Sequence, residues 1–237
     1  MANIYLLRHG KVRGEAALYG HTDVAVDSSV DEDIIKQLTL LNLDIDVFYT
    51  SPLQRCAQLA DKISQQYQRC AKSLAGLKEM NFGRYDGVAF DTLYQNSQVW
   101  QQLERFWINP AKHSLPHAEE LTTFACRVIN AWRLIVDDLL KKSPHSNILV
   151  VCHGGVIRMI LAQLLNVDYR QAKWYTQLTI ANGSLTTIEV NNGQCRVKNI
   201  AKPLVNGLYN KNSAVESNNE LVDLLSLETD KITVGSV

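Results

Sequence analysis

The sequence has no excess of charge of either sign. Its 237 residues include 24 basic and 24 acidic side chains, so the formal net charge at pH 7 is zero. A balanced charge gives no electrostatic basis for binding nucleic acid or an anionic membrane surface. We therefore expect neither as a partner, and any anion must be bound by a few basic side chains placed locally.

The sequence also lacks a long hydrophobic run. No apolar stretch approaches the roughly 20 residues that a helix needs to span a bilayer. The first predicted strand begins within three residues of Met1, which leaves no room for a signal peptide. Apolar residues make up 46% of the chain and charged residues 20%, which is typical of a protein that buries a hydrophobic core. These features predict a cytoplasmic protein.

Cysteine is scarce and irregularly spaced. The five cysteines are odd in number and form no C-x-x-C pair: Cys56, Cys70, Cys126, Cys152 and Cys195. This pattern argues against a disulfide framework and against a zinc knuckle. It predicts a protein of a reducing compartment.

Strand-like and helix-like segments alternate along the chain. Their apolar spacing predicts strands over residues 3–8, 45–50, 147–152, 178–181, 184–190 and 195–200, with a weaker one near 73–78. It predicts helices over residues 31–42, 53–68, 90–106, 119–141 and 154–165. Alternation of this kind predicts an α/β fold, with helices on both faces of a sheet. Asn-Gly pairs at 182–183 and 192–193 predict hairpins at a sheet edge.

Composition divides the chain into one α/β domain over residues 1–203 and a tail over 204–237. Within the domain, residues 81–118 are rich in Trp, Tyr, Gln and Asn and are typical of an insertion that covers a site. Its aromatic side chains could stack on a base or ring, but their helical spacing favours a place in the core. The tail is rich in Asn, Ser and Glu, which predicts a flexible segment with one short helix near 219–227.

Two of the predicted strands end in the same way, with a histidine followed by a glycine. These endings are His9-Gly10 and His153-Gly154. Ligands bind at the carboxyl ends of strands in a parallel sheet, so we expect both imidazoles in one site. A neutral imidazole can attack phosphorus, and Arg8 beside His9 supplies a fixed positive charge for a phosphate. A solvated strand-end histidine is the alternative at each position.

A second motif, from Thr50 to Arg55, predicts a helix that begins directly after a strand. Ser51 and Gln54 fit a capping box, with Pro52 at the first helical position. A cation in the first turn is disfavoured by about 0.3–1 kcal/mol, so Arg55 in this position indicates a bound anion. The alternative is a solvated surface arginine.

Two carboxylates between Leu77 and Gly87 are candidates for a general acid. Transfer of a phosphoryl group to histidine requires a proton on the leaving oxygen, and a partly desolvated glutamate can deliver it. We favour Glu79 over Asp86 on position, although their chemistry does not separate them. His21, in the loop from Tyr19 to Asp23, is either a substrate ligand or an ordinary turn residue.

Together these motifs resemble the histidine phosphatase superfamily, also called phosphoglycerate mutase-like. The R-H-G signature, the S-P-L-x-R helix start, the E-x-x-F-G-x-(W/Y)-(D/E)-G segment and the late V-x-H-G-G follow the family's order over residues 3 to about 200. The resemblance implies a three-layer α/β/α sandwich with a mostly parallel central sheet and a helical insertion over the active site. It further implies no metal, no cofactor, and the activity of a histidine acid-type phosphatase, which hydrolyses phosphoric monoesters.

The resemblance also assigns roles to individual residues. His9 would be the phosphorylated nucleophile, and Glu79 the general acid and then the general base. His153 would act in catalysis by stabilising charge in the transition state. The phosphate pocket would consist of Arg8, Arg55, His153 and Gly154.

The segments from Tyr19 to Val24 and from Phe82 to Gly87 look most like the α-ribazole phosphatase branch. This implies α-ribazole 5′-phosphate as the small phosphorylated substrate, and a homodimer is a candidate assembly. Glu15 stands where many members carry an asparagine that contacts phosphate, so with His21 it belongs to a candidate substrate loop. Two alternatives stay open: a mutase that returns the phosphoryl group to its substrate, and a module that binds phosphorylated ligands without turnover.

Overall fold

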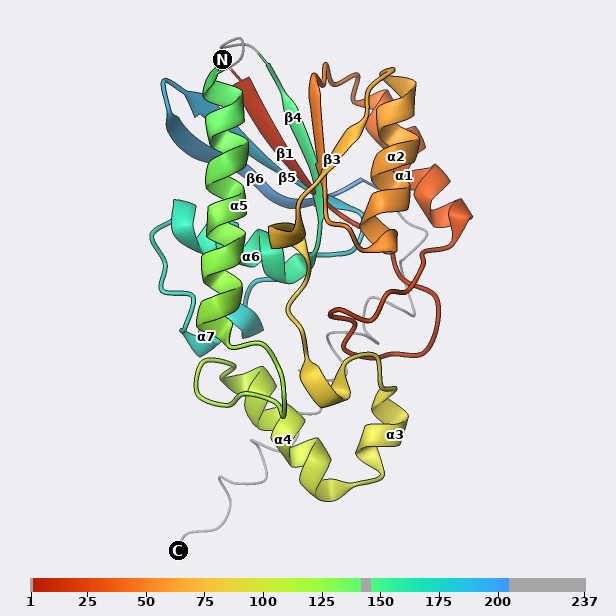
Figure 1. Ribbon diagram of the computed structural model, residues 1–237, viewed down its shortest axis with the longest axis vertical. Helices are drawn as coiled ribbons and strands as arrows, with labels where there is room; N and C mark the ends of the chain where they lie inside the picture. The colour runs from red at the N-terminus through yellow and green to blue at the C-terminus, as the bar shows by residue number, and fades with distance from the viewer. Residues whose placement is uncertain (1, 142–145, 205–237) are drawn as a thin grey trace, which may run out of the picture. The chain divides into compact units, whose positions relative to one another are not determined.

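The two apolar runs that end in His-Gly lie side by side as parallel strands at the centre of a sheet (Figure 1). In the computed structural model, which describes residues 2–141 and 146–204, β1 (Ala2–Arg8) pairs with β4 (Ile148–Cys152). Ile4 is opposite Ile148 and Arg8 is opposite Cys152. The register therefore brings the carboxyl ends of both strands to the same level, with His9 and His153 following directly.

The sheet has six strands in the order β3-β2-β4-β1-β5-β6. The remaining strands are β2 (Val47–Thr50), β3 (Ala71–Ser73), β5 (Ser184–Asn191) and β6 (Gln194–Pro203). The first four strands of this order are parallel, and β5 and β6 are antiparallel additions at one edge. Asn192 and Gly193 both have positive φ and join β5 to β6, as the Asn-Gly signal predicts.

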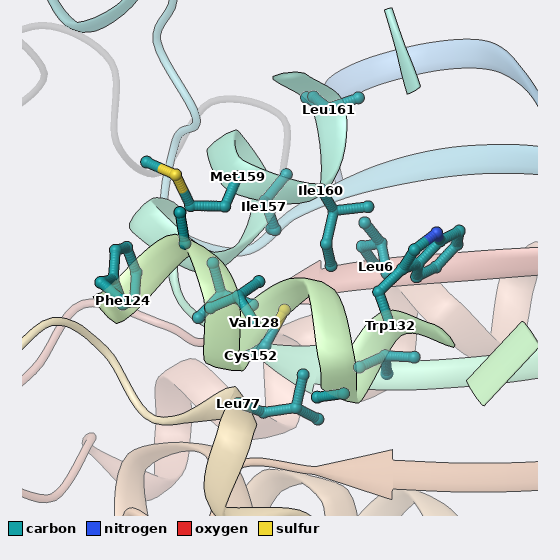
Figure 2. Close-up of a cluster of buried hydrophobic side chains, with 14 of the residues drawn as sticks. Leu6, Leu77, Phe124, Val128, Trp132, Cys152, Ile157, Met159, Ile160 and Leu161 are labelled. Carbon is teal, nitrogen blue, oxygen red and sulfur yellow. The ribbon is translucent and has the colours of Figure 1, made fainter. Parts of the chain in front are cut away.

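Helices cover both faces of the sheet. The four that follow or precede the strands are α1 (Ser28–Leu40), α2 (Gln54–Gln66), α5 (Leu121–Lys141) and α6 (Gly154–Leu164). Alternate residues of a strand point to opposite faces, and Leu6 and Cys152 pack with α5 and α6 in one buried cluster that includes Val128 and Ile157 (Figure 2). In Figure 1, α1 and α2 lie on the other side of the strands. The prediction of an α/β fold with a mostly parallel sheet is confirmed.

The insertion contains two helices where one was predicted over residues 90–106. These are α3 (Phe90–Tyr94) and α4 (Ser97–Ile108), and they lie together at one end of the described domain (Figure 1). The helix breaks at Asn96, because its side-chain oxygen accepts hydrogen bonds from the backbone N–H groups of Gln98 and Val99. α3 begins beside the loop that follows β1, where Phe90 donates its backbone N–H to the carbonyl of Ala16.

The aromatic side chains of the insertion are divided between core and surface. Phe106 is buried, and Phe90, Trp100 and Trp107 are half-buried and meet edge to face at centroid distances of 5.5–6.4 Å. Tyr94 is 67% exposed, so its predicted place in the core is wrong.

The other short elements are the 3₁₀ turns η1 (Ala75–Leu77) and η2 (Gly83–Tyr85), and α7 (Ala172–Thr176).

Two predicted strands differ in the structure. The weak strand near 73–78 is β3, which ends at Ser73 and gives way to η1. Residues 178–181 form no strand, because the carbonyl oxygens of Leu178 and Ile180 accept hydrogen bonds from arginine side chains instead of from a neighbouring strand. Residues 205–237 of the predicted tail, with its helix near 219–227, lie outside the described residues. Within the described residues, no helix has the length and apolar character required to cross a membrane.

Candidate active site

His9 lies at the carboxyl end of β1, in a buried position. Its backbone N–H continues the ladder to β4 by donating to the carbonyl of Cys152, and its side chain is only 6% exposed. The ring Nδ1 is 2.6 Å from the carbonyl oxygen of Gly10, so Nδ1 carries the hydrogen and the lone pair is on Nε2. Burial holds the pKa of His9 well below 6.5, and the charges of Arg8 and Arg55 lower it further. The imidazole is therefore neutral, as a nucleophile requires.

His153 lies beside His9, as the matching strand ends predict. The two ring centroids are 5.1 Å apart, and His153 is fully buried at the start of α6. Its Nδ1 accepts a hydrogen bond of 3.2 Å from Arg55 Nε, so its Nε2–H donates to Ser51 Oγ at 2.8 Å. Both ring nitrogens are thus engaged within the protein, and a contact between His153 and a phosphate would replace the bond to Ser51.

Ser51 is not a helix cap, and the predicted capping box is wrong. α2 begins at Gln54, whose backbone N–H donates to the carboxylate of Asp23 at 2.7 Å. Asp23 is therefore the acceptor at this helix terminus, although it lies 31 residues earlier in the chain. Ser51 is instead free to accept from His153, which the local sequence pattern could not reveal.

Arg55 organises the loop after β1 in addition to contacting His153. Its side chain is 1% exposed and donates to the carbonyl oxygens of Thr22, Tyr19 and Gly20 at 2.6–3.0 Å. With the bond to His153, four of the five guanidinium N–H groups have partners within the protein. One N–H therefore remains for the phosphate contact that the sequence predicts.

Asp86 anchors the same loop, which separates it from Glu79. Its carboxylate accepts from the backbone N–H groups of Gly20, His21, Thr22 and Phe82 at 2.8–3.2 Å. Burial acts to raise the pKa of Asp86, but hydrogen bonds from Thr22, Phe82 and His21 outweigh it and the pKa is lowered. A carboxylate stabilised in this way is a structural anchor rather than a proton donor.

The carboxylate of Glu79 lies against the start of α6, the helix that directly follows His153. Its two carboxylate oxygens accept from the backbone N–H groups of Met80 and Gly155, both at 3.0 Å. Gly155 is required for this approach, because a Cβ there would lie 2.2 Å from Glu79 Oε1. The carboxylate is thus bound to Gly155, two residues after His153, in a place where a general acid could serve the same site.

Arg127 holds the backbone of Glu79, and no sequence motif predicts this role. From α5, all five of its N–H donors have partners. Two bind the carboxylate of Glu119 at 2.6 and 2.8 Å, and the others bind the carbonyl oxygens of Gly76, Lys78 and Glu79 at 2.7–3.1 Å. An arginine within an amphipathic helix pattern is indistinguishable from a solvated one until the packing partner of the helix is known.

Arg8 is the arginine with the most open donors in the predicted pocket. Within the described residues the only hydrogen bond of its side chain is from Nη1 to the carbonyl of Ile180, and its buried Nε has no partner. Burial and the neighbouring charge of Arg158 lower the pKa of Arg8 to about 10, at which it is still a cation near neutral pH. A Cβ at Gly154 would lie 3.4 Å from the guanidinium, so Arg8 lies against the start of α6. The structure therefore brings Arg8 and Gly154 together.

The two residues of the predicted substrate loop have different positions. Glu15 is exposed, and its carbonyl oxygen accepts from the hydroxyl of Tyr19 at 2.7 Å. Among the described residues its carboxylate contacts no other member of the site. His21 is half-buried with an unpartnered Nε2, and burial and then the charges of Arg127 and Lys78 lower its pKa. His21 thus lies beside the segment that carries Glu79.

No three His, Cys, Asp or Glu side chains in the described part of the chain are grouped as ligands for a metal ion. The chemistry that this geometry offers is a neutral imidazole with a free lone pair, a second imidazole 5.1 Å away, a fixed carboxylate and an arginine with unused donors.

Comparison with known proteins identifies the family. The family model for the histidine phosphatase superfamily (branch 1) matches residues 4–203. The chain is 30% identical to putative phosphoserine phosphatase 2 of Hydrogenobacter thermophilus, over 70% of this chain and 80% of that protein. It is 26% identical to adenosylcobalamin/alpha-ribazole phosphatase of Escherichia coli, over 79% and 90%. The structure of Bacillus stearothermophilus YhfR matches with a TM-score of 0.74 at 21% identity, over 85% of this chain and 98% of that one. The chain belongs to the histidine phosphatase superfamily, as its four motifs predict.

Proposed function

We propose that this protein hydrolyses phosphomonoesters through a phosphohistidine intermediate on His9. The observation that carries the proposal is the state of His9: a buried neutral imidazole whose Nδ1–H is held by Gly10, which leaves the Nε2 lone pair free. Arg8 with its open donors lies in the same site, as does the carboxylate of Glu79. Membership of a superfamily of histidine phosphatases supports this chemistry.

The first half of the reaction forms the phosphoenzyme. His9 Nε2 attacks phosphorus in line, and the bond from phosphorus to the leaving oxygen breaks as the bond to nitrogen forms. Glu79 gives a proton to the leaving oxygen, so that an alcohol departs rather than an alkoxide. Arg8, the remaining N–H of Arg55 and the backbone N–H groups at Gly154 bind the other phosphoryl oxygens.

The second half returns the enzyme to its starting state. Glu79, now ionised, accepts a proton from water as the water attacks phosphorus, and inorganic phosphate leaves His9. His153 acts by exchanging its bond to Ser51 for a bond to a phosphoryl oxygen, which stabilises charge in the transition state. This exchange requires only that the Nε2–H change its acceptor.

Two substrates are supported by different observations. The loop segments from Tyr19 to Val24 and from Phe82 to Gly87 favour α-ribazole 5′-phosphate, in agreement with the relative of that name. The relative with 30% identity carries the name of a phosphoserine phosphatase, which favours O-phosphoserine. Both esters therefore belong in the test.

The test measures phosphate release by the wild type and by His9→Ala from p-nitrophenyl phosphate, α-ribazole 5′-phosphate and O-phosphoserine. His113→Ala is the matched control, because His113 is an exposed histidine outside the site. We expect turnover by the wild type and the control, and none by His9→Ala. Turnover that survives in His9→Ala would contradict the proposal. A phosphoryl group transferred to an added alcohol in place of water would indicate the mutase, and phosphate bound without turnover would indicate the binding module.

A further inference from the structure

The arginines in and around the site fall into two groups, according to how many of their guanidinium N–H groups have hydrogen-bond partners within the protein. Arg127 has partners for all five N–H groups and Arg55 for four. The guanidinium groups of Arg8 and Arg158 each make one hydrogen bond within the described residues. The first two hold the scaffold together, whereas the other two retain donors that can bind a ligand.

Arg158 lies close to Arg8, because both side chains bind carbonyl oxygens of the same backbone segment, residues 178–180. It is on α6, one turn after Gly155, and its Nη2 donates to the carbonyl of Leu178 at 2.8 Å. Arg8 donates to the carbonyl of Ile180, two residues further along. The Cα atoms of residues two apart are separated by at most about 7 Å, so the two guanidinium groups are neighbours.

The backbone of Arg158 is fixed, so its side chain projects from a rigid position. Its carbonyl oxygen accepts from Trp174 Nε1 at 3.3 Å, in addition to its place in α6. The Nε of Arg158 is buried and has no partner, like the Nε of Arg8. A buried polar donor without an acceptor costs free energy unless a ligand or another group satisfies it.

Positive charge also exceeds negative charge around Arg158, because Arg8 and Arg158 both interact with the one carboxylate of Glu79. Burial lowers the pKa of Arg158, while the negative charge of Glu79 opposes that shift. The charge of Glu79 acts in the same sense on the pKa of Arg8, so both cations share the charge of one carboxylate. A bound phosphoryl group would compensate Arg8, and a second anion would be needed to compensate Arg158.

We propose that Arg158 binds a second anionic group of the substrate, a carboxylate carried by the leaving group, beside the phosphoryl group bound by Arg8. The inference rests on the proposed function, because it places the phosphoester at His9. A planar guanidinium with free donors matches a carboxylate in two-point contact. The preferred substrates are then phosphorylated hydroxy acids or amino acids, ahead of esters with uncharged leaving groups such as α-ribazole 5′-phosphate.

The alternative is that Arg158 only supports the segment around Leu178. The test compares O-phosphoserine with O-phosphoethanolamine, two esters that differ by the carboxylate. For the wild type we expect kcat/KM to be about 10- to 100-fold higher on O-phosphoserine, the usual effect of a hydrogen-bonded charge. Arg158→Gln should remove this preference, because kcat/KM falls much more on O-phosphoserine than on O-phosphoethanolamine.

Controls separate a local effect from a loss of structure. Arg133→Gln makes the same substitution at an exposed position on α5 and should keep the preference of the wild type. An equal loss on both esters in Arg158→Gln, or no preference in the wild type, would overturn the inference. Arg158→Lys keeps the positive charge and an ammonium group that can donate to the carbonyl of Leu178. This variant should be as stable as the wild type but lose most of the preference for O-phosphoserine.

A binding measurement keeps the inference testable without turnover. Calorimetry with His9→Ala, alone and combined with Arg158→Gln, gives the affinity for both esters. Tighter binding of O-phosphoserine that disappears with Arg158→Gln supports the inference, and equal affinities overturn it. Absence of phosphate release by the wild type from every ester, including p-nitrophenyl phosphate, would instead reject the proposed function.

Discussion

Arg127 donates a hydrogen bond of 2.8 Å from Nη2 to the backbone carbonyl oxygen of Glu79. The same guanidinium binds the carboxylate of Glu119 with two N–H groups, and Glu119 in turn accepts from the backbone N–H of Asn81 at 3.3 Å. Glu79 is therefore held from both sides along the chain. Arg127 contacts no reacting atom in this arrangement, so it is a positioning residue.

Arg127→Lys should lower the activity of the enzyme through Glu79. Lysine keeps the charge but cannot bind Glu119 and three carbonyl oxygens together, and a shift of about 1 Å at a catalytic group can cost about 10²-fold in rate. We expect kcat to fall on an alkyl phosphate, with a much smaller fall on p-nitrophenyl phosphate, whose leaving group needs less protonation. Equal losses on both esters would indicate a general structural defect.

Arg133→Lys is the control for this experiment, since Arg133 is exposed on the same helix. The double variant with Glu79→Gln provides a second check. If Arg127 acts through Glu79, the loss from Arg127→Lys should be absent once Glu79 has been replaced. Independent, additive losses would contradict the positioning role.

Gly155→Ala should displace the carboxylate of Glu79. An added Cβ would lie 2.2 Å from Glu79 Oε1, inside the contact limit, so the side chain must move and lose its bond to the backbone N–H of residue 155. General acid catalysis contributes about 10²–10⁴-fold, and we expect a loss within that range on alkyl phosphates. Gly154→Ala is the comparison, because a Cβ there meets Arg8 only at 3.4 Å and should cost less. Steady-state kinetics on alkyl phosphates measure both losses, and a loss in Gly154→Ala as large as that in Gly155→Ala would contradict the prediction.

Asp86→Asn should reduce stability rather than alter the chemical step. The carboxylate accepts four backbone N–H groups, three of them in the loop of residues 20–22 that Arg55 also binds. Hydrogen bonds to a charged group contribute about 1.5–3 kcal/mol each, so denaturant unfolding should show a loss of at least that size. Alkyl and aryl phosphates should be affected alike. A selective loss on alkyl phosphates would mean that Asp86, not Glu79, is the general acid.

The two buried histidines should make stability depend on pH. Burial holds the pKa values of His9 and His153 well below 6.5 in the folded protein, whereas the unfolded chain binds protons near 6.5. Their contribution to the free energy of unfolding is therefore complete above pH 6.5. It is lost as the pH falls below 6.5, at up to about 1.4 kcal/mol per pH unit for each histidine.

Denaturant unfolding between pH 7.5 and 5 tests this expectation. His9→Gln should show a shallower fall in the free energy of unfolding than the wild type, because one of the two histidines no longer titrates on unfolding. His113→Gln, which changes an exposed histidine, should follow the wild type. A slope in His9→Gln equal to that of the wild type would show that His9 does not remain neutral in the fold.

Most of the fold could be predicted because its signals are local. The apolar runs before His9 and His153 are continuous, as expected of strands buried on both faces, and the Asn192-Gly193 turn has the positive φ angles that its sequence favours. The false strand at 178–181 had a suitable apolar pattern. Its backbone carbonyls bind Arg8 and Arg158, which are distant in sequence, so no local pattern could exclude it.

The site was predictable where a residue type and its position both indicated chemistry. His9, Glu79 and His153 come from short motifs, and the structure brings them to one end of the sheet. The division of the arginines was not predictable, because it depends on which carbonyl oxygens each guanidinium meets after folding. Asp23 as the acceptor at the start of α2 was missed for the same reason.

His9 should carry the phosphoryl group during turnover. Rapid acid-free quenching of the enzyme during turnover of p-nitrophenyl phosphate, followed by peptide mass spectrometry, would locate the covalent adduct. Glu79→Gln should make the adduct accumulate, because it slows attack of water while this leaving group departs with little protonation. We predict one phosphoryl group per chain, on the peptide that contains His9, stable in alkali and labile in acid. Full phosphate release without an adduct on His9, or an adduct on another residue that persists in His9→Ala, would contradict the account.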